Sequence, residues 1–159
     1  VDIEEAEKQA AEDVVAQREE SLANQLREMR QRKKKLVDPL QFEMGIQAED
    51  LSGYVPAFGY QMSPASENQL KAIERFGINP DGIENAGKAE LLINRLIKRR
   101  ESGLTTPKQI RFLEGRGFLH VGTWDFDSAK TLIDRIAANG WRIPAGIVPG
   151  EYIPKTAGN

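Results

Sequence analysis

The hydrophobic pattern of the chain is strongest in two stretches that lie forty residues apart. Apolar side chains recur at helical spacing through residues 66–98, and the pattern returns without a gap in residues 106–138. Eight of these 33 aligned positions are identical, against about two expected from ordinary composition. The sequence therefore predicts a tandem duplication of one small unit. The identical pairs are Gln69/Gln109, Glu74/Glu114, Gly77/Gly117, Gly82/Gly122, Ala89/Ala129, Leu92/Leu132, Ile93/Ile133 and Arg95/Arg135.

The first helix of each unit has a clear start and a clear stop. Ser66 and Thr106 are each followed three positions later by glutamine, which is the pattern of a capping box. Gly77 and Gly117 can take the left-handed conformation that ends a helix. We interpret the shared glutamines and glycines as caps in preference to ligands.

A second helix follows in each unit, opened by Asn85 or Asp125 and ended in the second unit by Asn139 and Gly140. A single hairpin buries too little apolar surface to be stable alone, whereas two can close a shared core. We expect an all-α chain in which two helical-hairpin repeats, residues 65–104 and 105–144, form a pseudo-twofold four-helix domain. Aromatic bulk for its core is expected from Phe112, Phe118, Trp124, Phe126 and Trp141.

Residues 1–36 are predicted to form one long charged helix, because residues 2–36 contain neither proline nor glycine. Acidic side chains crowd its start and basic ones its end, as the helix dipole favours. A thin apolar seam at seven-residue spacing suits packing against a partner helix or another domain. The seam consists of Val15, Leu22, Met29 and Leu36. The basic run at residues 32–35 is interpreted as a solvated helix end, with nucleic-acid contact as the alternative.

The remaining segments are expected to be less regular. In residues 37–64, Asp38 and Pro39 open a short helix to about residue 47, followed by an irregular linker. The aromatic and aliphatic side chains of that linker indicate packing against protein. Residues 145–159 should form an extended tail, pinned by Ile147, Tyr152 and Ile153.

Composition excludes several kinds of chemistry. The chain has a net charge of −2, no cysteine and one histidine, which rules out disulfides, thiolate metal sites and a histidine cluster. We therefore expect no cofactor and no bound metal. No apolar run is long enough to span a membrane and no signal peptide opens the chain, so we expect a cytoplasmic protein without a membrane partner. Its oligomeric state is left open, and the start at Val1 hints at a piece of a larger protein.

One motif resembles a nucleotide-binding loop. Residues 82–89 match seven places of the phosphate-loop pattern, but Ala89 stands where a hydroxyl should bind magnesium. No buried strand is predicted before it, and residues 122–129 lack the second glycine and the lysine. We interpret the segment as a turn that leads into a helix.

Four stretches resemble the C-terminal region of phage and prophage-type superfamily II DEAD/DEAH-box helicases. They are residues 36–39 (Leu-Val-Asp-Pro), 106–111 (Thr-Pro-Lys-Gln-Ile-Arg), 120–124 (His-Val-Gly-Thr-Trp) and 135–139 (Arg-Ile-Ala-Ala-Asn). The motor motifs of such helicases are absent from the chain. The resemblance implies a non-catalytic accessory domain whose ATP-hydrolysing motor lies upstream in the same polypeptide.

Two functions follow from these patterns. In the first, basic side chains near the helix ends bind the backbone of DNA or RNA at two equivalent hairpins, with steep salt dependence. In the second, the domain is a protein-interaction scaffold that docks on the helicase motor or on a replication partner through the seam. An independent enzyme is the least favoured, because no nucleophile and base can be paired. The candidate nucleic-acid contacts are Lys71, Lys88, Lys98, Arg99, Arg100, Lys108, Arg111, Arg116, Lys130 and Arg142.

Overall fold

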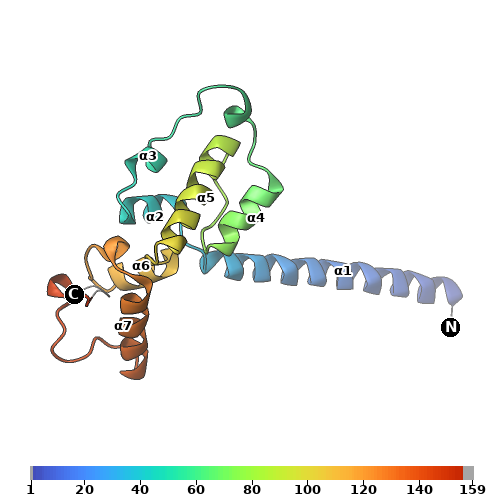
Figure 1. The fold of residues 1–159 in the computed structure, drawn as a ribbon. Helices are drawn as coiled ribbons and strands as arrows, with labels where there is room; N and C mark the ends of the chain where they lie inside the picture. Colours follow the sequence, from blue (N-terminus) through green and yellow to red (C-terminus); the bar gives the residue numbers. More distant parts are fainter. Residues whose placement is uncertain (1, 156–159) are drawn as a thin grey trace. The chain divides into compact units, whose positions relative to one another are not determined.

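The computed structural model describes residues 2–155, and regular structure in this range is entirely helical (Figure 1). Its β-type pairings are three isolated bridges. The chain divides into two compact units between Lys35 and Leu36. No helix among these residues is both long enough and apolar enough to cross a membrane.

The first unit is the single helix α1, Ile3–Lys34. The Asp2 carboxylate caps it by accepting a hydrogen bond of 3.0 Å from the Glu4 amide, and the last turn is basic. None of its residues is buried. The expected seam is wrong at its last member: Leu36 lies beyond the end of α1 and belongs to the second unit, where its carbonyl accepts a hydrogen bond from Arg111.

Within residues 36–155, the second unit contains six α-helices and three short 3-10 helices. In chain order these are α2 (Pro39–Gly45), α3 (Glu49–Ser52), η1 (Gly59–Met62), α4 (Glu67–Arg75), α5 (Ala86–Glu101), α6 (Pro107–Glu114), η2 (Val121–Thr123), α7 (Phe126–Ala138) and η3 (Pro149–Glu151). Helices α4 and α5 make the first hairpin and α6 and α7 the second. Every predicted N-cap of these four helices is observed.

Each shared glutamine joins the starts of both helices in its hairpin. Gln69 and Ser66 form a complete capping box, and Gln69 Nε2 also donates to the carbonyl of Ala86, 3.4 Å away in α5. In the second hairpin, Gln109 caps with Thr106 and donates to the carbonyl of Phe126 at 3.3 Å. The glutamine therefore fixes the spacing of two helix starts besides capping one of them.

Backbone hydrogen bonds at the base of the hairpins also recur forty residues apart. The amide of Ala86 donates to Ser63 at 2.7 Å, and the amide of Phe126 donates to Gly103 at 2.8 Å. Gly77 and Gly117 end the first helices in the left-handed region, with φ of 90° and 94°. These local features agree with the caps and stops that the sequence predicts.

The hairpins contribute to one hydrophobic core. Fully buried side chains come from all four helices and include Ile73, Leu92, Leu113, Leu132 and Ile136. Phe118 and Trp124 are buried as expected, with ring centroids 5.9 Å apart. Two of the expected core aromatics are exposed, Phe126 at 39% and Trp141 at 59%. Trp141 packs edge-on against Phe112, which is itself only partly buried.

Residues 37–53 contain the predicted short helix, observed as α2, and they also contribute side chains to the core. Val37, Phe42 and Leu51 are among the most deeply buried side chains of the chain. Helix α2 packs against α6 and α3 packs against α5, so this segment touches both hairpins. Val37 also exchanges backbone hydrogen bonds of 2.8 Å with Gly77 and Asn79.

The expectation that the following linker packs against protein holds only in part. Val55, Phe58, Tyr60 and Met62 are all more than half exposed. Tyr54 and Gln61 nevertheless lie against Gly87 of α5. The short helix η1 also packs against α5, and the amide of Ala86 donates to the carbonyl of Ser63.

The tail is pinned at two of the three predicted positions. Ile147 and Tyr152 pack against the core, the latter with its ring centroid 5.5 Å from that of Phe118. Ile153 is 83% exposed, so its expected contact is not made.

We predict that Gln109→Ala lowers the free energy of unfolding by about 1–3 kcal/mol, because a nearly buried amide loses partners in two helices. Urea denaturation of the full chain measures this. Lys130→Ala on the exposed face of α7 is the control and should change stability by less than about 0.5 kcal/mol. Equal effects of the two variants would contradict the role of Gln109.

We predict that Gly122→Ala destabilises the chain by about 1–3 kcal/mol, since a Cβ there would lie 2.6 Å from the backbone oxygen of Gly45 at the end of α2. Gly150→Ala is the matched control, because no atom lies within 4 Å of its added Cβ. Thermal unfolding compares the two. A Gly122→Ala variant as stable as Gly150→Ala would show that α2 is not held against η2.

Candidate nucleic-acid interface

A basic groove of about 750 Å³ lies between the two hairpins of the second unit. One wall comes from the ends of α4 and α5, and the other from residues 103–107 and the start of α7. We call it the arginine groove. It is lined chiefly by Arg75, Phe76, Ile97, Arg99, Arg100 and Phe126.

Positive charge dominates this lining. Arg75 reaches it from α4, and Arg99 and Arg100 reach it from the last turn of α5, whereas Asp127 is the one acidic side chain in the lining. Lys108 adds a further cation close by, because its side chain lies against Gly77, directly after Phe76. The groove is therefore suited to an anion.

Apolar and aromatic surfaces form the rest of the groove. Phe76 is half-buried and Phe126 is 39% exposed, and the two come from different hairpins. The guanidinium carbon of Arg100 lies 5.2 Å from the centroid of the Phe76 ring, a distance at which a cation is attracted to the ring face. The groove thus combines ring faces with cations.

Arg99 joins the two hairpins beneath the groove. Its Nη2 atom donates to the carbonyls of Thr105 and Gly122 at 3.2 and 2.9 Å, and to the Thr105 hydroxyl at 3.2 Å. Burial, and secondly the charge of Arg95, lower the pKa of the Arg99 guanidinium, although an arginine stays protonated at neutral pH. Arg99 therefore supplies a fixed charge and has a structural role.

The helix starts offer fewer free amides for binding a phosphate than the sequence suggested. In each of α4, α5, α6 and α7 the N-cap side chain accepts a hydrogen bond from the third amide of the helix. The N-cap of α7 is the Asp125 carboxylate, whose pKa is lowered chiefly by a hydrogen bond from Ser128. That negative charge competes with a phosphate at the same helix end.

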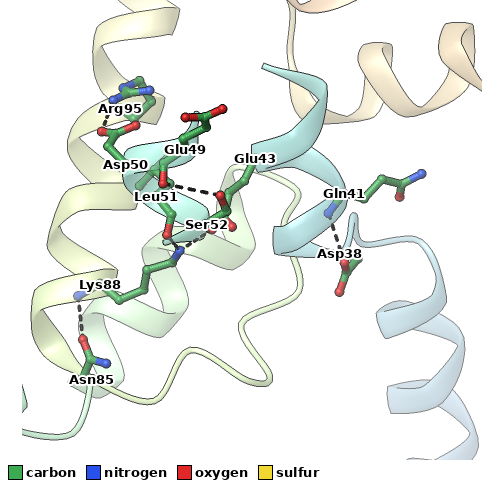
Figure 2. A network of polar contacts seen from close by, with 10 residues as sticks. All are labelled: Asp38, Gln41, Glu43, Glu49, Asp50, Leu51, Ser52, Asn85, Lys88 and Arg95. Carbon is green, nitrogen blue, oxygen red and sulfur yellow. Dashed lines mark hydrogen bonds and ion pairs between the residues drawn. The ribbon is translucent and has the colours of Figure 1, made fainter. Parts of the chain in front are cut away.

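The lysine of the loop-like motif is turned into the protein (Figure 2). Lys88 Nζ lies 2.6 Å from a carboxylate oxygen of Glu43, which is 3% exposed, and also donates to the carbonyl of Leu51. Its neighbour Arg95 pairs with Asp50 at 2.6 Å. Lys88 thus joins α5 to the segment that contains α2 and α3, and its charge is compensated inside the fold.

Two more of the predicted contacts make internal interactions. Arg111 donates to the carbonyl of Leu36 at 2.9 Å. Arg116 lies over the Phe112 ring, with its guanidinium carbon 3.6 Å from the ring centroid. The Phe112 ring in turn packs edge-on against Trp141.

The other predicted basic residues lie on the surface away from the groove lining. Lys71 pairs with Glu67, and Lys130 with Asp134, each at 3.1 Å. Lys98 and Arg142 are exposed. Of the ten predicted contacts, Arg99 and Arg100 line the groove and Lys108 lies near it.

Arg75 is a basic residue of the groove that was not among the predicted nucleic-acid contacts. Arg75 lines the groove although Gly115 occupies the aligned position in the second unit. Its place four residues after Lys71, on one face of α4, was the available signal.

A second cavity, of about 500 Å³, lies between α2 and η2. Burial raises the pKa of Glu114 there, against smaller opposite effects of His120 and the Val121 amide. No group of three metal-ligating side chains occurs in residues 2–155. The cavity lacks a set of side chains that points to one reaction or ligand.

Comparison of the chain with family models, curated proteins and solved structures found no match.

We predict that Lys88→Met lowers the free energy of unfolding by about 3–5 kcal/mol, because it leaves the Glu43 carboxylate buried without a charge partner. The double variant Glu43→Gln/Lys88→Met should recover most of that loss, as measured by urea denaturation. Stabilisation of the chain by added ATP that disappears with Lys88 would instead make this lysine a nucleotide ligand.

Proposed function

We propose that residues 36–155 form a non-catalytic module that binds single-stranded DNA or RNA in the arginine groove. The observation that supports this most directly is the meeting of Arg75, Arg99 and Arg100 with Phe76 and Phe126 in one concavity. Proteins that hold single strands combine cations along the phosphates with rings on which bases stack.

The form of the groove favours a single strand over a duplex. Its volume of about 750 Å³ is in the range of sites that hold small ligands, about 300–1,000 Å³. Bases can reach rings inside such a groove only when they are unstacked, as in a single strand. Arginine binds phosphate in a bidentate manner without reading sequence, so binding should be weakly sequence-selective.

We further propose that the module is the accessory region of an ATP-dependent helicase, as the four resembling stretches suggest. In that role it holds a strand while motor domains upstream hydrolyse ATP. The arrangement of its two hairpins is proposed to be pseudo-twofold, which the hydrogen bonds that recur forty residues apart support.

The alternative is a scaffold that docks on the motor or on a replication partner. One observation favours it: α1 presents Val15, Leu22 and Met29 at 53%, 57% and 44% exposure. Such a strip on a long charged helix suits another helix better than nucleic acid.

We predict that Arg75→Glu/Arg100→Glu weakens binding of a fluorescent single-stranded oligonucleotide at least tenfold in anisotropy titrations of the full chain. Each lost phosphate contact should also reduce the slope of log affinity against log salt by about 0.7. The matched control is Lys98→Glu/Lys130→Glu, which makes the same charge change outside the groove lining.

Phe126→Leu separates stacking from charge in the same assay. It keeps an apolar side chain and removes a ring face, so affinity should fall while the salt slope stays unchanged. Equal weakening by the control pair, a preference for duplex, or no binding at low salt would contradict the proposal.

A further inference from the structure

Helix α1 has the length of a dimerisation element but lacks packing of its own. Its 32 residues extend over about 48 Å at 1.5 Å per residue. None of them is buried. Because most helical stability in proteins comes from packing of an apolar face, a helix of this length gains stability from a partner.

The charges along α1 are divided between its two halves. Residues 2–20 contain eight acidic and two basic side chains, a net charge of −6. Residues 21–36 contain one acidic and six basic side chains, a net charge of +5. The boundary between the two halves, at residues 20 and 21, lies close to the midpoint of Ile3–Lys34. That midpoint falls between residues 18 and 19.

The acidic first half and the basic second half of α1 favour another copy of α1 as the partner, and they favour an antiparallel orientation. Two parallel copies of α1 would place acid against acid and base against base, which destabilises a helix pair. Two antiparallel copies place each acidic half against a basic half. With the midpoints aligned, Glu7 of one copy lies opposite Arg30 of the other.

Two pairs of apolar side chains agree with the reversed pairing, whereas Met29 then lies opposite Lys8. Val15 and Leu22 lie on opposite sides of the midpoint at equal distances, and so do Ala11 and Leu26. Reversal of one copy therefore brings Val15 to Leu22 and Ala11 to Leu26. The strip is thin, so the charged halves have to supply much of the attraction and all of the orientation.

We propose that α1 pairs with α1 of a second copy of this chain in an antiparallel two-stranded coiled coil. The inference identifies the partner of the exposed strip on α1. It rests on α1 alone and is independent of nucleic-acid binding by the groove.

Sedimentation velocity of the full chain at increasing concentration tests the pairing. We expect a monomer–dimer equilibrium that shifts toward monomer at high salt, because exposed charge pairs are screened. Arg27→Glu/Arg30→Glu changes the second half to three acidic and four basic side chains, from +5 to +1. This variant should raise the dimer dissociation constant at least tenfold.

The matched control is Arg27→Lys/Arg30→Lys, which keeps the charge and should keep the dimer. Circular dichroism checks that α1 stays helical in both variants. A chain that stays monomeric at every concentration overturns the proposal, and so does a dimer that the glutamate variant leaves intact.

Spin labels determine the direction of the pair. The chain has no cysteine, so Ala6→Cys gives one label per chain. In an antiparallel pair the labelled positions are about 25 residues apart along the axis, or about 38 Å, whereas parallel helices would bring them within about 10–15 Å. A label at Gln17→Cys is the control, because it is close to its counterpart in both directions. A short distance at residue 6 overturns the antiparallel pairing.

Discussion

The hydrogen bonds of one glutamine side chain set the geometry of each hairpin. Gln109 accepts from the backbone amide of Thr106 and donates to the carbonyl of Phe126, so a single amide group fixes the starts of two helices. Gln69 does the same forty residues earlier, with Ser66 and Ala86. Two short helices would otherwise meet at any of several packing angles. With their starts tied, their apolar faces are directed to the same core.

The sequence predicted this frame because its signals are local. The N-cap, the repeat of apolar side chains and the left-handed glycine of each first helix lie within a dozen residues. Each of these signals marks the start, the buried face or the end of a helix. The burial of Val37 and Phe42 was missed because it depends on contacts with distant residues such as Gly77 and helix α6. The exposure of Trp141 has a similar cause. Its hydrophobicity favours burial, but whether the core has room for the ring depends on how the helices pack.

The candidate site was predicted only in part, for a related reason. A lysine or arginine can extend into solvent or bury its stem and pair inside. Lys88 and Arg99 take the second course, and the acceptors that they use, Glu43 and Gly122, are remote in sequence. Arg100 lies at the surface, and Arg75 lies with it on the same wall of the groove. The sequence shows which residues are charged, whereas their positions in space depend on the tertiary structure.

The two hairpins have similar caps but different charged side chains, and these differences shape the arginine groove. Arg75, Arg99 and Arg100 align with Gly115, Asn139 and Gly140, so the second hairpin cannot repeat the basic wall. Two equivalent nucleic-acid contacts, as the duplication suggested, would therefore need other cations in the second hairpin. The first hairpin supplies the cations, and the second supplies the facing wall through Phe126. The arginine groove therefore depends on both hairpins, because each of them contributes one of its walls.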